Sequence, residues 1–224
     1  MTTLVVIPAR GGSKGIPRKN LLPVGGKPLI VWTIEQALAL DDVIVAVSTE
    51  DAEISAVARN AGAWVIRRPE ALAQDETPTE PVVVHAIATC EAQYGRPERV
   101  MLLQATSPVR LEGTLQRAVE EFDASGVDSL VGVVPNPPFL WSQDDDGVVS
   151  AHWDWEHRLR RQDMTAGQLR YRETGSMYVT KPEIYETLGN RMGGRIGLFV
   201  MAEAEGVDID TLHDVSLAEA LLTR

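Results

Sequence analysis

The chain has 224 residues, of which 44% are hydrophobic and 24% are charged, and these proportions exclude a largely disordered protein. Lysine and arginine number 21 against 32 acidic residues, and the net charge of −11 argues against binding to nucleic acid or to an anionic membrane surface. The length suits one α/β domain with a small excursion, so we expect a soluble protein that handles small molecules.

Cys90 is the single cysteine of the chain, which excludes an intramolecular disulfide. Its apolar helical setting is typical of a small core residue. The amino terminus lacks the basic and extended apolar regions of an export signal, and no apolar run approaches membrane-spanning length. We therefore expect a cytoplasmic protein, because the reducing cytosol suits a chain without disulfides.

A short apolar run at residues 4–7 predicts a buried strand, which Pro8 bounds. Residues 8–20 (PARGGSKGIPRKN) then combine three glycines with four cationic side chains. Glycines let backbone N–H groups approach an anion closely, and neighbouring cations supply the charge. No acidic residue precedes Glu35, so this basic island contrasts with the acidic remainder of the chain. The stretch predicts a polyphosphate-binding loop, and the alternative is a solvated loop that happens to be basic.

Helical and strand patterns alternate through the next part of the chain. Strands are predicted at residues 43–47, 63–66, 100–103 and 130–134, and helices at 29–40, 79–94 and 111–122, with a further helix that Ser48–Asp51 opens and Gly62 ends. Such alternation predicts βαβ units and a largely parallel sheet, in which ligands bind beyond the carboxyl ends of the strands. Arg10, Arg68 and Gln104 each follow a strand end, so we expect them to share one crevice.

The alternating pattern stops after Pro135. Asp144–Gly147 between apolar flanks predicts a hairpin, and three of the five tryptophans lie close to it: Trp141, Trp153 and Trp155. We interpret this region as an interaction arm, most simply a homodimer contact, with the alternative that the hairpin folds onto its own domain. Residues 1–224 therefore form one predicted domain, with an arm at 136–172 inserted within it.

The remaining chain returns to the α/β pattern after a basic stretch at residues 158–172. Strands are predicted at 173–180 and 196–201, a helix at 182–188 and a final helix from about Asp214. Asp208 and Asp210 precede this last helix, and alternate residues of an extended segment face the same side. Two such carboxylates suit Mg²⁺ held together with substrate phosphates, and the alternative is a solvated edge or the start of the helix.

Other catalytic frameworks fit this sequence poorly. The glycines lack the G-x-x-x-x-G-K-[ST] and G-x-G-x-x-G spacings, and no G-x-S-x-G occurs. The four histidines, His85, His152, His157 and His213, have no zinc-ligand spacing. The residues alone therefore indicate an α/β protein that binds a nucleotide polyphosphate with Mg²⁺ and transfers a phosphoryl or nucleotidyl group, without choosing the base or the acceptor.

The stretch from Pro8 to Asn20 resembles the amino-terminal signature of the acylneuraminate cytidylyltransferases, the CMP-sialic acid synthetases. Five further segments match that family in order: Arg68-Pro69 with Leu72-Ala73 and Asp75; Leu102-Leu103-Gln104 with Thr106-Ser107-Pro108 and Arg110; Arg161-Gln162-Asp163; Arg172 to Tyr178; and Asp208-Ile209-Asp210-Thr211. The resemblance covers essentially the whole chain. It implies a three-layer, Rossmann-like nucleotidyltransferase fold with a mostly parallel sheet and a small dimerisation arm.

The resemblance also implies the reaction, in which CTP and a nine-carbon 2-keto sugar acid give the CMP-sugar and pyrophosphate with Mg²⁺. The catalytic residues that it implies are Arg10, Lys14, Lys19, Asp208 and Asp210, of which the two aspartates hold the metal. The nucleotide-binding residues that it implies are Arg10, Gly12, Ser13, Lys14, Lys19, Asn20, Arg68 and Thr79. The sugar-binding residues that it implies are Gln104, Arg161, Arg172 and Tyr178, and Arg161 matches an arginine that the family's arm contributes across a dimer interface.

Two departures from the family pattern lie in the sugar-facing half. Thr174 stands where the family usually has asparagine, whose amide both donates and accepts hydrogen bonds. The spacing from Arg161 to Gly175 is also a few residues longer than usual. The acceptor therefore stays open, with another sugar acid such as Kdo as one alternative. A non-catalytic nucleotide-binding protein on the same fold is a further alternative, although retention of the metal pair argues against it.

Overall fold

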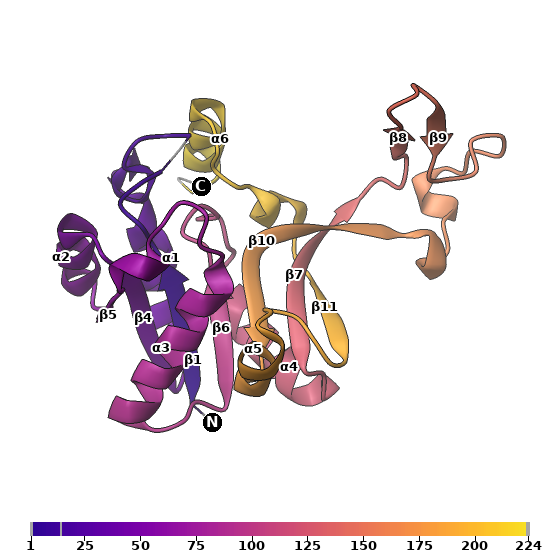
Figure 1. Cartoon of the computed structure of the whole chain (residues 1–224). Coiled ribbons are helices and arrows are strands. Elements are labelled where there is room, and N and C mark those ends of the chain that lie inside the picture. Colours follow the sequence, from indigo (N-terminus) through magenta and orange to yellow (C-terminus); the bar gives the residue numbers. More distant parts are fainter. Residues whose placement is uncertain (1, 14, 223–224) are drawn as a thin grey trace.

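The computed structural model describes residues 2–13 and 15–222, and a seven-stranded sheet forms its centre (Figure 1). The strand order is β11-β7-β10-β6-β1-β4-β5. The strands are β1 (Thr3–Pro8), β4 (Val43–Thr49), β5 (Trp64–Arg67), β6 (Arg99–Leu103), β7 (Ser129–Asn136), β10 (Arg170–Thr180) and β11 (Ile196–Val200). β10 pairs antiparallel with β6 and β7, and the other neighbouring pairs are parallel. The predicted mostly parallel α/β sheet is confirmed, with one antiparallel strand that the sequence pattern did not indicate.

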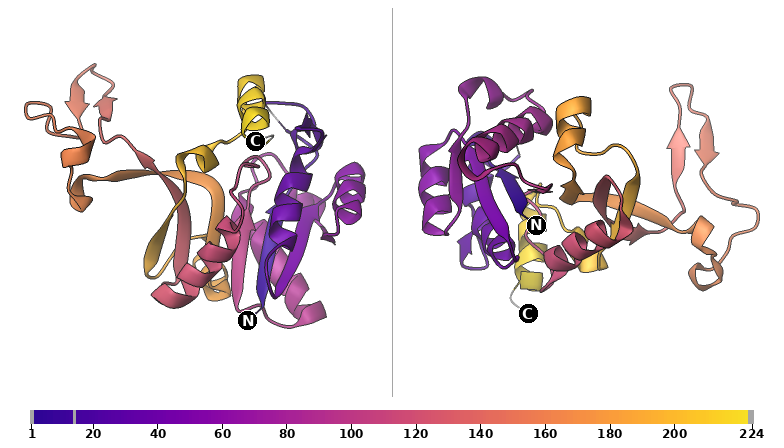
Figure 2. Two further views of the ribbon diagram at one scale, coloured as in Figure 1. Left: turned by 180° about the vertical axis from the view of Figure 1, so that it is seen from behind. Right: turned by 90° about the horizontal axis from the view of Figure 1, so that it is seen from below.

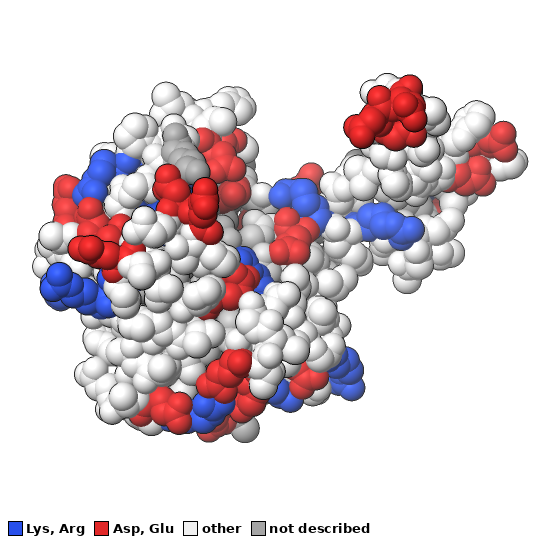
Figure 3. All heavy atoms as spheres, in the orientation of Figure 1, with Lys and Arg blue, Asp and Glu red and all other residues white. Residues whose placement is uncertain are grey.

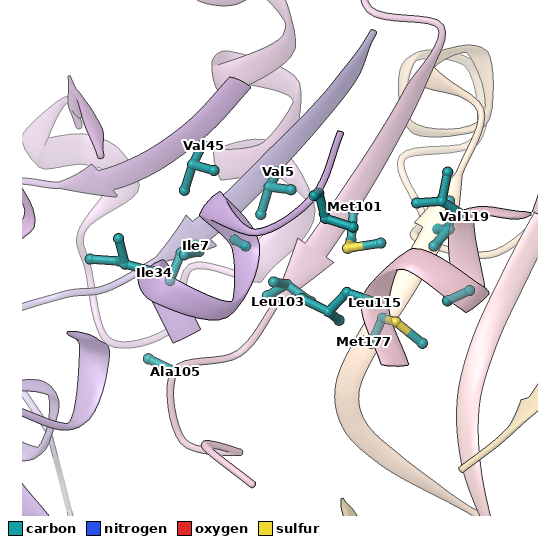
Figure 4. Packing of buried hydrophobic residues seen from close by; sticks show 14 of the residues in the cluster. Val5, Ile7, Ile34, Val45, Met101, Leu103, Ala105, Leu115, Val119 and Met177 are labelled. Carbon is teal, nitrogen blue, oxygen red and sulfur yellow. The ribbon is translucent and has the colours of Figure 1, made fainter. Parts of the chain in front are cut away.

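Helices cover both faces of the sheet, which gives three layers. They are α1 (Leu29–Leu38), α2 (Ala52–Asn60), α3 (Thr79–Tyr94), α4 (Thr114–Ser125) and α5 (Pro182–Leu188), whereas α6 (Leu212–Leu222) packs in a separate apolar cluster with Val24 and Ile209. Alternation along β1 sends Val5 and Ile7 into the cluster under α1, α2 and α4, which Figure 4 shows in part. Leu4 and Val6 point into the second cluster, under α3 and α5. The β-branched runs that predicted strands are thus buried on both faces, as a parallel sheet requires.

The observed elements lie within a few residues of the predicted ones. The largest shifts are three residues: β10 begins at Arg170 rather than Glu173, and α4 begins at Thr114 rather than Leu111, because Gly113 precedes it with a left-handed φ of 74°. A small hairpin of β2 (Pro23–Val24) and β3 (Lys27–Pro28) was not predicted. Short 3₁₀ turns occur at Lys19–Leu21, Glu70–Leu72, Arg161–Asp163, Ala166–Gln168 and Glu203–Gly206. Among the helices of the described chain, none is long and apolar enough to cross a membrane.

The predicted hairpin forms and projects from the α/β body (Figures 1 and 2). β8 (Trp141–Gln143) pairs antiparallel with β9 (Val149–Ala151) around the Asp-Gly turn. The outer parts of β7 and β10 form the stem, in which Asn136 pairs with Arg170. The ring of Trp153 packs edge-on against Phe139 at 4.8 Å and Trp141 at 5.9 Å between centroids. Three aromatic side chains of the arm, Phe139, Trp141 and Trp153, therefore pack against one another.

Candidate functional site

A cavity of about 420 Å³ opens at the edge of the sheet where β1, β5 and β6 end. Pro8 at the end of β1, Arg68 directly after β5 and Gln104 directly after β6 all line it. Arg10 lines the same space, so the strand-end positions bring these side chains together as parallel topology predicts. The volume is typical of a site for a small molecule.

Most of the predicted site residues lie on this cavity. Those that line it are Arg10, Gly12, Ser13, Lys19, Asn20, Arg68, Thr79, Gln104 and Asp210. Asp208, Arg172 and Tyr178 lie outside its wall. Lys14 falls outside the described residues, and so does the side chain of Arg161. The predicted nucleotide-binding residues are therefore gathered on this cavity more fully than the predicted sugar-binding residues.

The glycine-rich loop is fixed by contacts with the segment that follows β4. The Gly11 N–H donates to Glu50 Oε1 at 2.7 Å, and a Cβ on Gly11 would lie 2.6 Å from Asp51 Oδ2. A Cβ on Gly12 would meet nothing within 4 Å. Gly11 thus permits close packing of the loop, whereas Gly12 borders open space in the cavity.

Arg18 holds the loop to α2 rather than facing the cavity. Its Nη2 atom donates to Asp51 Oδ1 at 3.0 Å and to Glu53 Oε2 at 2.5 Å. Asp51 caps α2 by accepting from the backbone N–H groups of Glu53 and Ile54. The hydrogen bond from Arg18 is the largest cause that holds the pKa of the Asp51 carboxyl below its usual range. One of the four loop cations is therefore structural.

Arg10 and Lys19 are paired with oxygens at the cavity wall. Arg10 Nη1 donates to Asp75 Oδ1 at 2.8 Å, and Lys19 Nζ donates to Asp210 Oδ1 at 3.0 Å. The Asn20 amide supports Arg10 by donating to its carbonyl oxygen at 3.2 Å. Both cations already point toward anionic groups, so a polyphosphate that enters the cavity would meet donors that are held in place.

Arg68 is a buried cation, with 5% of its surface exposed. Its Nη2 atom donates to the Ser48 carbonyl at 2.6 Å, and Nε donates to the Ser48 hydroxyl at 3.3 Å. Burial lowers the pKa of Arg68, and the charge of Arg10 lowers it further, against an opposing effect of Glu50. A buried cation with neutral partners gains most from an anion, so the arrangement favours a negatively charged ligand.

Asp208 and Asp210 flank Ile209, which is fully buried and donates its N–H to the Thr106 carbonyl at 2.8 Å. Asp210 lines the cavity, whereas Asp208 lies outside its wall. Asp208 accepts from Ser107 Oγ at 3.2 Å. Within the described chain, no group of three or more His, Cys, Asp or Glu residues is arranged to hold a metal. Two carboxylates fit Mg²⁺, which completes its shell with substrate phosphates and water.

The side chain of Gln104 lies against Gly175, where a Cβ would be 3.5 Å from Gln104 Oε1. Gly175 has a φ of 71° in the irregular part of β10 between Glu173 and Tyr178. Thr174 is buried, and its hydroxyl donates to the Gly132 carbonyl and accepts from the Ser176 N–H. The threonine that replaces the family's asparagine therefore supports the backbone of this bulge from within.

Tyr178 and Arg172 make contacts inside the protein. The Tyr178 hydroxyl donates to the Glu173 carboxylate, and burial followed by this hydrogen bond raises the pKa of Tyr178 to about 12. Arg172 Nη2 donates to the Gly206 carbonyl at 3.1 Å, which braces the segment that carries Asp208. Their predicted contacts with a sugar acid stay predictions.

Several residues of the cavity wall had no role in the sequence interpretation. Gln74, Asp75 and Thr77 line the side formed by the loop between β5 and α3. Asp75 belongs to one of the matched segments, and its pairing with Arg10 across 65 positions is the contact that gives it a role. Arg110 also belongs to a matched segment and is buried behind the wall.

Comparison with known proteins gives consistent matches over the chain. A sequence model of the family described as Cytidylyltransferase matches residues 4–181. N-acylneuraminate cytidylyltransferase A of Danio rerio is 35% identical over 226 residues, which cover 98% of this chain and 50% of that protein. Pseudaminic acid cytidylyltransferase of Campylobacter jejuni is 31% identical over 230 residues, which cover 99% of this chain and 96% of that protein. The chain spans about half the length of its N-acylneuraminate cytidylyltransferase relatives.

Among solved structures, the fold is similar to that of CMP:2-keto-3-deoxy-manno-octonic acid synthetase complexed with CTP. The TM-score is 0.74 at 17% sequence identity, and the match covers 100% of this chain and 99% of that chain. This likeness supports the same α/β fold.

Proposed function

The chain belongs to the cytidylyltransferase family, and on this premise we propose that it transfers CMP from CTP to the anomeric hydroxyl of a nonulosonic, sialic-type acid. Pyrophosphate is the second product. One observation carries the proposal: a single cavity joins the glycine-rich basic loop, the buried cation Arg68 and the carboxylate of Asp210. This combination suits the triphosphate of a nucleotide better than an uncharged ligand.

The nucleotide half of the site binds and neutralises charge. Arg10, Lys19 and Arg68 provide cationic donors to the phosphates, with Ser13 and, from the family resemblance, Lys14 beside them. In phosphoryl and nucleotidyl transfer, negative charge spreads over phosphate oxygens in the transition state, so fixed donors around these oxygens lower the barrier. Thr79, at the start of α3, lines the same cavity and is proposed to lie near the base.

Asp208 and Asp210 are the residues proposed to hold Mg²⁺. The cation would neutralise charge on the phosphate oxygens that share it with the two carboxylates. Lys19 contacts both the Ile209 carbonyl and the Asp210 carboxylate, so the basic loop and the aspartate segment are joined at this point. This link keeps the proposed metal ligands beside the proposed phosphate donors.

The acceptor half is proposed to include Gln104, Arg172 and Tyr178, with Arg161 supplied by a partner's arm. The anomeric oxygen of the sugar acid attacks the α-phosphorus, its proton is released, and the bond from the α-phosphorus to the pyrophosphate oxygen breaks. Binding that holds the two reactants in line provides much of the rate enhancement. The relatives named above use different acids, so the alternative acceptor is another sugar acid such as Kdo.

A panel experiment tests the proposal. The protein is incubated with Mg²⁺, CTP and one of neuraminate, legionaminate, pseudaminate, Kdn or Kdo, and pyrophosphate release is followed. We expect release with at least one nine-carbon acid, and little release when ATP, GTP or UTP replaces CTP. Binding of CTP without release on any acid would instead favour the non-catalytic nucleotide-binding protein.

We also propose that the arm contacts a second copy of the chain. Large apolar side chains are exposed on the arm at Leu140, Trp141, Val148, Val149, Trp155, Leu159 and Leu169. Ile196, Leu198 and Val200 on the edge strand β11 are each about half exposed. On the face in Figure 3, acidic side chains gather at the tip of the hairpin, and uncharged surface covers much of the remaining arm. Such surface favours a protein partner, and a homodimer is the simplest.

A further inference from the structure

Arg110 is a buried cation that has no role in the proposed chemistry. It has 7% of its surface exposed, and its Nη1 atom donates to Thr33 Oγ1 at 3.2 Å and to Gln36 Oε1 at 2.9 Å. Burial lowers the pKa of Arg110 to about 10, with a partial opposing effect of Glu205. An apolar side chain would fill this space without the cost of desolvating a charge. The buried guanidinium therefore needs a role that an apolar side chain of similar size would not provide.

The second terminal nitrogen of the Arg110 guanidinium joins two segments of the cavity region. Arg110 Nη2 donates to the Gln104 carbonyl at 3.2 Å and to the Ser176 carbonyl at 2.8 Å. The Gln104 N–H also donates to the Ser176 carbonyl, at 3.3 Å. A planar guanidinium that reaches both carbonyls fixes the start of the loop after β6 relative to the bulge in β10.

This junction lies beside the side-chain amide of Gln104. Gly175 adjoins Ser176, and a Cβ on Gly175 would be 3.5 Å from Gln104 Oε1 and 3.6 Å from Nε2. The Gln104 side chain therefore packs against the backbone that Arg110 holds. Gln104 lines the cavity, whereas Arg110 lies behind its wall.

We propose that Arg110 is a positioning residue for the acceptor, because it sets the place of Gln104 in the cavity wall. The inference rests on the proposed function, in which Gln104 meets the sugar acid. A displacement of about 1 Å in a positioning group reduces a rate by up to about 100-fold. Loss of the Arg110 bridge should accordingly affect use of the sugar acid far more than binding of CTP, whose proposed ligands lie on other elements.

The kinetic test compares Arg110→Met with a matched control, Arg99→Met. Arg99 is equally buried, but it lies at the start of β6, where its guanidinium bonds Thr3 and Asp123. We expect Arg110→Met to raise the KM for the sugar acid at least tenfold while the Kd for CTP changes less than twofold. Arg99→Met should change neither by more than twofold. Equal weakening of acid and CTP in Arg110→Met, or no change in either, would overturn the proposal.

A second measurement does not depend on activity. The side-chain amide resonance of Gln104 is identified by its loss in Gln104→Ala and compared in ¹⁵N-labelled protein. We expect it to shift in Arg110→Met and to stay in place in Arg99→Met. A wild-type protein that transfers CMP to no acid would refute the proposed function, while an unmoved Gln104 resonance would refute the role of Arg110.

Gly175→Ala is the second variant, to be used if Arg110→Met does not fold. The added methyl group faces the Gln104 amide, and the φ of 71° disfavours alanine locally. We expect the same selective rise in the KM for the sugar acid and the same shift of the Gln104 resonance. Retention of both wild-type values would show that the Gly175 junction does not position Gln104.

Discussion

Replacing Asp210 by asparagine removes one negative charge from the cavity wall and keeps the size of the side chain. The carboxylate is 75% exposed, and its ion pair with Lys19 spans 3.0 Å. Exposed ion pairs contribute about 0–1 kcal/mol to the free energy of unfolding. For a chain of this length, that loss corresponds to a fall in Tm of at most roughly 4 °C. The fold should therefore survive the change.

The change should slow turnover strongly, although it lowers the free energy of unfolding only slightly. In the proposed site Asp210 supplies one of two carboxylates for Mg²⁺, and metal ions contribute several kcal/mol of transition-state stabilisation. Loss of about 3 kcal/mol of this stabilisation slows turnover about 100-fold, since each 1.4 kcal/mol is about a factor of ten. We also expect the variant to need more Mg²⁺ for half-maximal activity.

The assay is pyrophosphate release at saturating CTP over a series of Mg²⁺ concentrations, with thermal unfolding of the same samples. Asp128→Asn is a matched control, because Asp128 pairs with Lys181 at 2.7 Å at the opposite end of the sheet. The control should lose a comparable amount of stability and keep its turnover. Unchanged turnover and Mg²⁺ dependence in Asp210→Asn would refute the metal assignment.

Three further changes test other parts of the structure. Asp51→Ala should lower the free energy of unfolding by about 1 kcal/mol at neutral pH, because the carboxylate caps α2 and binds Arg18. The pKa of Asp51 is lower in the folded state than in the unfolded state. The stability difference is therefore fully present above the unfolded pKa of about 3.9 and is lost as the pH falls through the folded pKa. Urea unfolding at several pH values measures this difference, and a difference that does not depend on pH would contradict the prediction. Trp155→Glu, in the exposed apolar surface of the arm, should convert a dimer into a monomer in sedimentation experiments, and a monomeric wild type would contradict the proposed interface. Arg161→Ala should raise the KM for the sugar acid and leave the Kd for CTP nearly unchanged, whereas equal loss of both would remove Arg161 from the acceptor side.

The strands were predictable because each is a short apolar run buried on both faces, as in β1 and β6. The direction of β10 was not predictable from its own residues. It follows from the connection: β7 runs out to the arm, and the chain returns beside it as β10, which makes the pair antiparallel. The bulge at Gly175 then breaks the alternation, so the face of each side chain in β10 cannot be counted from its sequence position.

The part of the cavity that lies at the strand ends was predictable, because Arg10 and Arg68 each follow the end of a parallel strand. The composition of the loop alone did not distinguish Arg18 from the other loop cations, although the family resemblance left it out of the implied site; its role depends on Asp51, 33 positions away. The pairing of Asp75 with Arg10 and the bridge made by Arg110 are equally non-local. Such contacts arise from tertiary packing, and no spacing within one segment encodes them.

The place of β10 also has a consequence for the order in which the chain folds. β1, β4, β5 and β6 have one another as neighbours and are all synthesised before residue 104. β7, with six buried residues, has as its two neighbours β10 and β11, both of which are synthesised after the arm. During synthesis, one edge of β6 and both edges of β7 therefore stay unpaired until strands that follow residue 169 are made. Unpaired apolar strands are prone to aggregation, so β10 joins the two halves of the sheet, and β11 then pairs with the remaining edge of β7 and ends the interval in which the nascent chain most needs protection.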